Sequence, residues 1–176
     1  MVQISFPNTI QTKDIDAYPP ENMKSELVEL ICSELRARLE RLAKAALAAH
    51  EAATDPGSKA ESKYDTRSLE ESYLATGQAR QVKELGETLR TFENLKLRKF
   101  SENEPIDAGA LVTLRVPGKL QNIHFLLAPA AGGLEIVFQN KEITLLSPES
   151  PLYEKLLGNA IGVKIESPNF EIVAVC

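Results

Sequence analysis

Residues 54–67, TDPGSKAESKYDTR, decide how the rest of the chain is organised. Asp55-Pro56-Gly57 is a strong turn signal, because proline presets φ and glycine accepts the left-handed conformations of tight turns. The stretch lies between two long segments whose apolar residues recur at helical spacing. If these segments pair as an antiparallel hairpin, residues 54–67 form its tip, about 50 Å from the start of the first helix. We therefore expect a charged tip on a helical stalk.

The first of these segments, residues 21–53, has the pattern of one long helix without glycine or proline. Its apolar positions follow at steps of three or four residues, as in the seam of a coiled coil. They are Val28, Ile31, Leu35, Leu39, Leu42, Ala46, Ala49 and Ala53. The change to alanine toward the tip predicts a stalk that narrows, because small side chains let helices approach. The alternative is that alanine is simply the best helix former.

The second segment, residues 68–98, carries a matching stripe. Its apolar residues are Leu74, Val82, Leu85, Leu89, Phe92 and Leu95. Ser68 and Glu71 have the spacing of a capping box, and so do Ser58 and Glu61, which leaves the start of this helix open. Antiparallel pairing then sets five pairs of residues opposite each other: Leu47 and Leu74, Leu39 and Val82, Leu35 and Leu85, Ile31 and Leu89, and Val28 and Phe92.

Beyond residue 104 the pattern changes to short strands separated by turn signals such as Pro117-Gly118. We expect strands at residues 111–116, 123–128, 134–138, 143–146, 163–166 and 170–175. Between the fourth and the fifth, Ser150 can cap a short helix that begins at Pro151 and ends at Gly158.

The expected fold class is therefore α+β, with an N-terminal antiparallel coiled-coil hairpin and a C-terminal antiparallel sheet with one short helix. We place an arm at residues 1–20, the hairpin at 21–98, a linker at 99–104 and the sheet unit at 105–176. The hairpin is expected to stand on the sheet as a separate unit.

Composition excludes several classes of function. The formal net charge of −5 argues against general or sequence-specific DNA binding, which needs an excess of Lys and Arg. Two cysteines, Cys32 and Cys176, make no disulfide framework, and two histidines, His50 and His124, are too far apart in sequence for a histidine metal site. No apolar run approaches the length of a membrane span, and the N-terminus has no signal-peptide pattern, so we expect a cytoplasmic protein. Separately, we expect it to be a monomer.

Three segments resemble the bacterial transcription elongation factors GreA and GreB. Residues 147–162, SPESPLYEKLLGNAIG, are similar to the Gre signature, in which Ser-Pro and a short apolar helix precede Leu/Ile-Gly. Residues 63–75, KYDTRSLEESYLA, and 125–130, FLLAPA, resemble a branch usually described as Gre-like. The resemblance covers about residues 21–176, and Val163 stands where Gre factors usually have Asp.

This resemblance implies an FKBP-like C-terminal domain that docks at the rim of the secondary channel of RNA polymerase, with the hairpin passing down the channel. In Gre factors two acidic tip residues help hold a second catalytic Mg²⁺, and the polymerase then hydrolyses backtracked RNA. The chain itself would hold no intrinsic cofactor and would not be an enzyme. Aligning Tyr64 with the tyrosine beyond the Gre tip places Gly57 and Ala60 where the two acids should be. Channel binding is therefore better supported than stimulation of cleavage.

Three groups of residues are candidates for function. The tip residues that could present Mg²⁺ or contact the polymerase active site are Asp55, Glu61, Asp65 and Arg67. The candidates for docking on the polymerase are Pro148, Ser150, Pro151 and Leu152. A basic patch that could face nascent RNA comprises Arg38, Arg41, Arg80 and Lys83. The structural alternatives are solvated turn acids, an ordinary helix start and an ordinary charged coiled-coil surface.

Two other functions remain open at this stage. The helical rod could serve a coiled-coil adaptor or scaffold protein, which would self-associate through its helices. The expected FKBP-like domain could belong to a chaperone or a peptidyl-prolyl isomerase, although such pockets usually need several convergent aromatic side chains and the chain contains no tryptophan.

Overall fold

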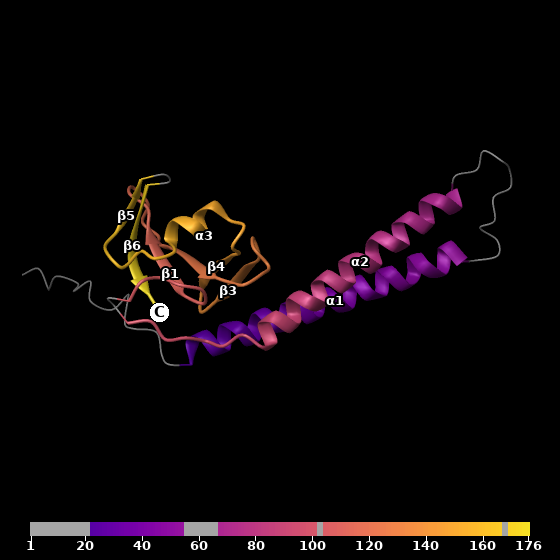
Figure 1. Ribbon diagram of the computed structural model, residues 1–176, viewed down its shortest axis with the longest axis horizontal. Coiled ribbons are helices and arrows are strands. Elements are labelled where there is room, and N and C mark those ends of the chain that lie inside the picture. The colour runs from indigo at the N-terminus through magenta and orange to yellow at the C-terminus, as the bar shows by residue number, and fades with distance from the viewer. Residues whose placement is uncertain (1–21, 55–66, 102–103, 167–168) are drawn as a thin grey trace, which may run out of the picture.

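A computed structural model describes residues 22–54, 67–101, 104–166 and 169–176 of the protein (Figure 1). Both expected helices of the hairpin and all the expected strands are present. Two long helices come first, α1 (Met23–Thr54) and α2 (Arg67–Glu93). The rest of the chain forms β1 (Leu111–Arg115), β2 (Ile123–Leu127), β3 (Glu135–Phe138), β4 (Lys141–Leu146), α3 (Pro151–Leu156), β5 (Lys164–Glu166) and β6 (Asn169–Val175).

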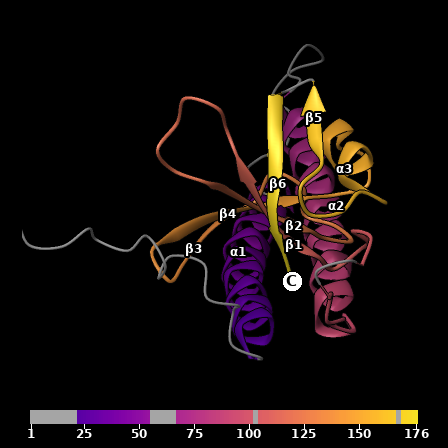
Figure 2. The ribbon, with the colours of Figure 1, turned by 90° about the vertical axis from the view of Figure 1, so that its left-hand side faces the viewer.

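The two long helices lie side by side and extend together away from the sheet (Figures 1 and 2). The predicted extension of the second helix to residue 98 is wrong, since α2 ends at Glu93. Its last turn is closed by Asn94, whose side-chain amide donates a hydrogen bond of 2.7 Å to the Arg90 carbonyl. The backbone N–H of Leu95 then bonds the Phe92 carbonyl at 3.1 Å. An asparagine that competes for backbone groups in this way favours the end of a helix.

The seam of the hairpin is tightly packed only near its base. Ile31 and Leu35 of α1 are buried there, together with Leu89 of α2. Leu47 and Leu74, which were expected to face each other, are 58% and 57% exposed. Toward the distal end the half-buried positions are Ala46, Ala49, Ala75 and Gln78. On α2 the seam therefore contains Ala75 and Gln78 instead of Leu74. A search for apolar residues does not detect Gln78, because its side chain is polar.

The sheet has the order β3-β4-β2-β1-β6-β5. All neighbouring strands are antiparallel except β2 and β4, which are parallel, so the sheet is mixed and the expectation of a wholly antiparallel sheet is wrong. The difference arises because β3 lies at the edge. A tight turn with left-handed Gln139 and Asn140 sends the chain back as β4 between β3 and β2, in the direction of β2.

Both faces of the sheet are covered, which explains the nearly continuous apolar runs of β1, β2 and β4. One core joins the hairpin base to one face of the sheet. Its buried members are Leu27, Ile31, Cys32, Leu35, Leu89, Phe92, Leu111, Leu126, Ala128, Leu134, Ile136, Ile143 and Leu145. The second core lies on the other face, where Tyr153 and Leu156 of α3 pack against Val112, Leu114, Leu127 and Ile172. The hairpin base thus shares a core with the sheet, whereas the sequence predicts two separate units.

Within the ranges that the structure describes, no helix combines the length and the apolar character needed to cross a membrane.

Candidate functional site

The expected tip lies mostly outside the described residues. Asp55, Glu61 and Asp65 fall within residues 55–66, which the structure does not describe, and only the backbone of Arg67 is described, as the first residue of α2. In the remainder of the chain no group of three or more His, Cys, Asp or Glu side chains could hold a metal ion. The role of the tip acids therefore stays a prediction.

The structure brings the docking candidates together at the start of α3. Ser150 has extended backbone angles, φ −78° and ψ 127°, and Pro151 follows as the first helical residue. Ser150 thus occupies the expected capping position, but its hydroxyl makes no capping hydrogen bond. Pro148 and Pro151 are exposed and Leu152 is half-buried, so this turn presents a small apolar surface to solvent.

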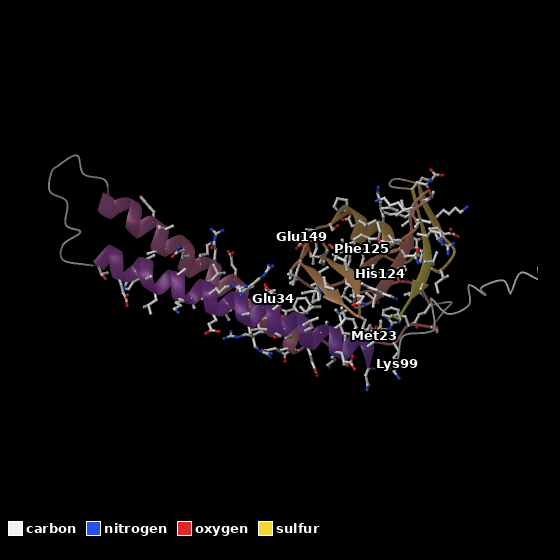
Figure 3. All side chains as sticks on the ribbon, turned by 180° about the vertical axis from the view of Figure 1, so that it is seen from behind. Met23, Glu34, Lys99, His124, Phe125 and Glu149 are labelled. Carbon is white, nitrogen blue, oxygen red and sulfur yellow. The ribbon has the colours of Figure 1, made fainter. Side chains whose placement is uncertain are left out.

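A close backbone approach fixes the loop that leads into α3. A Cβ atom placed on Gly132 would lie 2.4 Å from the Ser147 hydroxyl oxygen and 3.1 Å from its Cβ. The Ser147 carbonyl accepts a 2.9 Å hydrogen bond from the N–H of Ser150. Its hydroxyl donates to the Glu149 carboxylate, which lowers the pKa of Glu149. Figure 3 places Glu149 in the part of the sheet unit nearest the free length of the hairpin. Ser147 therefore shapes the turn that carries the docking candidates.

Each member of the basic patch has an acidic partner on its own helix. Arg38 and Arg41 both reach the half-buried Glu34 of α1, at 3.1 Å and 3.4 Å; Figure 3 labels Glu34. On α2 the pairs are Arg80–Glu84 at 2.9 Å and Lys83–Glu87 at 3.9 Å. These ion pairs offset the positive charge locally, as on an ordinary coiled-coil surface. Contact with RNA stays a prediction.

A polar junction at the hairpin base had no signal in the sequence. The ammonium of Lys24, in the first turn of α1, donates to the Gly109 carbonyl at 3.1 Å and to the Arg98 carbonyl. The ammonium also lies 4.8 Å from the centre of the Phe100 ring, and the Arg98 guanidinium lies 5.1 Å from the same ring centre. Arg98 in turn bonds the Asp107 carboxylate at 3.0 Å. From sequence, a lysine in the first turn of a helix is expected to be a solvated charge. Only the tertiary structure shows that Lys24 joins α1 to the segment before β1.

A second polar contact holds the two helices together near the base. The Arg36 guanidinium of α1 lies 2.7 Å from the Glu93 carboxylate at the end of α2. Both side chains are substantially exposed, so this ion pair contributes at most about 1 kcal/mol to stability. The ion pair serves alignment, because it joins the last residue of α2 to the residue of α1 that directly follows the buried Leu35.

The two thiols are structural rather than reactive. Cys32 lies in the core that the hairpin shares with the sheet, and Cys176 packs against that core. Burial raises the pKa of both thiols, and the charges around each act less strongly than burial. A raised pKa reduces the thiolate fraction at neutral pH, so neither cysteine has the character of a nucleophile.

Removing the charge of Lys24 is expected to change how stability depends on alkaline pH. Burial lowers the pKa of Lys24 from its ordinary 10.5; nearby Cys176 raises it, and the charge of Arg98 lowers it again. Between the lowered folded-state pKa and 10.5 the unfolded chain binds more protons, so Lys24 makes the free energy of unfolding rise with pH in that window. Urea unfolding of wild type and Lys24→Met, at neutral pH and just below pH 10.5, measures this. At the higher pH the free energy of unfolding of wild type should rise relative to that of the variant. The same difference in free energy at both pH values would contradict the lowered pKa of Lys24.

Among known proteins, the similarity lies with solved structures alone. No family model matches the sequence, and no curated protein matches it. Thermus thermophilus GreA factor homolog 1 (Gfh1) is 20% identical, with 82% of this chain and 94% of that chain covered and a TM-score of 0.32. Thermus aquaticus Gfh1 is 18% identical, with 81% and 92% covered and a TM-score of 0.31. Another structure of the transcription factor Gfh1 is 18% identical, with 82% and 92% covered and a TM-score of 0.33.

Proposed function

We propose that this chain is a Gre-like transcription factor that binds RNA polymerase at its secondary channel. One observation carries the proposal: a helical hairpin is anchored in the core of a small mixed sheet that also bears the Gre-like segment at residues 147–162. The sheet unit supplies a docking surface, and the hairpin carries its distal end away from that surface. This arrangement suits a factor that binds outside a channel and acts inside it.

The anchoring of the hairpin supports this role mechanically. Leu27, Ile31 and Phe92 are almost completely buried among residues of the sheet face, and Lys24 fastens α1 to the chain just before β1. Both apolar and polar contacts must break before the hairpin can pivot on the sheet. At about 1.5 Å per residue, the 32 residues of α1 span about 48 Å, so much of the rod extends beyond the sheet.

In this proposal the polymerase performs the chemistry and the chain modulates it, during elongation or during cleavage of backtracked transcripts. Any Mg²⁺ would be shared with the polymerase, since Mg²⁺ often takes only one or two protein carboxylates and keeps the rest of its shell elsewhere. Asp55 and Glu61 are the residues that would contribute, displaced from the usual Gre positions. The cytoplasm is the compartment in which such a factor would work.

The proposal predicts direct binding of the full chain to core RNA polymerase. Replacing both exposed prolines, Pro148→Ser with Pro151→Ser, should weaken binding at least about tenfold, because it removes the apolar surface at the start of α3. The exposed Lys164→Glu on β5 serves as a control and should bind like wild type. A pull-down at low salt measures both. Absence of binding by wild type, or equal binding by the proline variant, would count against docking through α3.

The same complexes test the tip. RNA cleavage by a stalled polymerase is compared between wild type and the variant Asp55→Ala with Glu61→Ala. Loss of cleavage in the variant assigns these acids to metal presentation, while equal cleavage removes them from the mechanism without affecting the docking result.

One observation favours the alternative of a coiled-coil adaptor. Leu47, Tyr73 and Leu74 are exposed on the distal half of the hairpin, where a second helical partner could cover them. Sedimentation at increasing concentration decides between the two functions, because an adaptor of this kind should increase in mass and a polymerase-binding monomer should not.

A further inference from the structure

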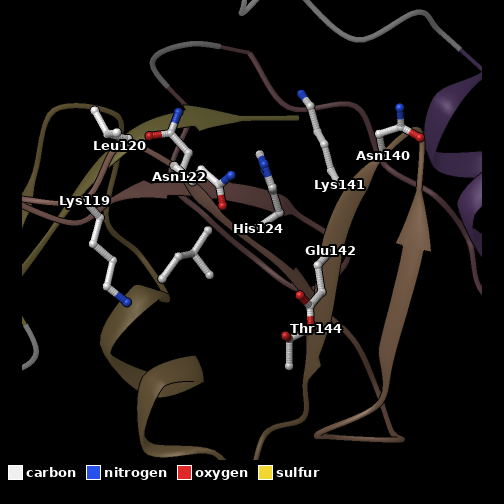
Figure 4. A pocket seen from close by; sticks show the side chains of 10 residues that line it. Lys119, Leu120, Asn122, His124, Asn140, Lys141, Glu142 and Thr144 are labelled. Carbon is white, nitrogen blue, oxygen red and sulfur yellow. The ribbon is translucent and has the colours of Figure 1, made fainter.

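A groove on the sheet unit has no role in the function proposed above. It has a volume of about 570 Å³ and lies where the parallel strands β2 and β4 both begin. The loop between β1 and β2 forms one wall and the turn between β3 and β4 forms the other. Figure 4 shows His124 and Lys141 extending toward one side of the sheet and Lys119 and Glu142 toward the other. The lining of the groove thus lies at the ends of these strands and includes side chains from both sides of the sheet.

Leu120 lines this groove and is a large apolar side chain that is exposed to solvent. It lies in the loop between β1 and β2, which projects from the sheet (Figure 2), and its side chain is fully exposed. The loop is not loose at this point, because the N–H of Lys119 bonds the Val116 carbonyl at 3.1 Å and Gly118 takes a left-handed φ of 81°. The closed turn thus holds the Leu120 side chain in solvent beside the groove, within reach of an apolar side chain of a bound segment.

The charges of the groove point to an anionic partner. Neither the Lys119 nor the Lys141 ammonium forms an ion pair within the described part of the chain, and Glu142 is the one acid among the described lining residues. The amide side chains of Gln121, Asn122 and Asn140 add hydrogen-bond donors. Since the whole chain carries a net charge of −5, this is a local excess of positive charge on an acidic protein.

The lining favours a peptide over a nucleic acid. Binding of single strands depends on aromatic side chains on which bases stack. The one ring among the described lining residues is the imidazole of His124, whose Nδ1 lies 3.0 Å from the hydroxyl of the buried Thr113. That contact fixes the ring on the strand. Carboxylates need only charge and donors, both of which the groove supplies, and Leu120 adds an apolar contact that phosphates cannot use.

We propose that this groove binds an acidic peptide segment of a protein partner, with carboxylates on Lys119 and Lys141 and an apolar side chain against Leu120. The site is independent of docking through α3 and of the hairpin. Its contacts are exposed to solvent, so binding is weak and depends strongly on salt. Raising the ionic strength from about 0.1 M to about 1 M shortens the screening length from about 10 Å to about 3 Å and should abolish most of it.

The test uses the full chain and a short fluorescent peptide of glutamates around a central leucine, with fluorescence anisotropy as the readout. Lys119→Glu with Lys141→Glu should weaken binding at least about tenfold. The matched control is Lys96→Glu with Lys164→Glu, which makes the same change of charge at exposed positions away from the groove. Equal weakening by both pairs would show attraction to the net charge alone and overturn the proposal.

The role of Leu120 is tested with a second peptide in which serine replaces the central leucine. Leu120→Ser should weaken binding of the leucine peptide about threefold or more and leave the serine peptide unchanged. An equal effect on both peptides contradicts the contact. Tighter binding of oligouridylate than of the acidic peptide would reassign the groove to RNA. Failure of the peptide to bind leaves the polymerase pull-down unaffected, so the two proposals can fail separately.

Discussion

Phe92→Ala is expected to lower the free energy of unfolding by about 3–5 kcal/mol, because the ring is only 1% exposed and its removal leaves a cavity in a packed core. Phe92 lies in the core that joins α1, α2 and one face of the sheet. Its loss therefore weakens the attachment of the hairpin and the packing of the sheet together. Urea unfolding measures the change. The matched truncation Leu47→Ala, at a 58% exposed position of α1, should cost less than about 0.5 kcal/mol.

The same experiment tests whether the hairpin and the sheet unfold as one unit. A shared core predicts that the helical signal in circular dichroism and the exchange of sheet amides change at the same urea concentration. Two separate transitions in wild type, or a loss of less than about 1 kcal/mol in Phe92→Ala, would contradict a shared core. In Phe92→Ala, binding to RNA polymerase through α3 should persist. The effect of the protein on RNA cleavage by the polymerase should decline, because the hairpin is no longer held at a fixed angle to the sheet.

Local sequence signals account for the elements but not for their arrangement. Every strand was expected within a few residues, since short β-branched runs are separated by turn residues. The parallel pairing of β2 with β4 has no such signal, because the direction of a strand depends on which neighbour it meets. Likewise, Leu95 continues the apolar period past the end of α2, and only the hydrogen bond from the Asn94 side chain explains why the helix stops.

The candidate site divides in the same way. The docking candidates lie within residues 148–152, so their grouping at α3 followed from a turn and a helix start. The junction around Lys24 and the groove beside Leu120 draw residues from segments far apart in the chain. Gln78 lies in the seam although it is polar, and Leu74 is exposed although it is apolar. At the distal end of the hairpin, most side chains are small, and burying one helix face or another differs little in free energy. The sequence therefore does not predict which face lies in the seam.

Gly132→Val is expected to destabilise the sheet unit by about 1–3 kcal/mol, the usual effect of forcing extra atoms into a packed site. Ser147 blocks the space that the first added carbon needs. The Ser147 hydroxyl can rotate away, but its Cβ at 3.1 Å and its backbone nitrogen at 3.3 Å cannot move without shifting the chain. Gly77→Ala on α2 is the control, because nothing lies within 4 Å of its added carbon. That change should stabilise the helix by about 1 kcal/mol.

The functional consequence follows from what Ser147 carries. Its carbonyl accepts the Ser150 N–H and its hydroxyl holds the Glu149 carboxylate, so displacing Ser147 moves the turn that presents Pro148 and Pro151. Gly132→Val should therefore lose polymerase binding at temperatures where the sheet is still folded, whereas Phe92→Ala should retain it. Binding and unfolding measured on both variants separate these effects. If Gly132→Val binds polymerase like wild type while it is destabilised, the start of α3 is not the docking surface.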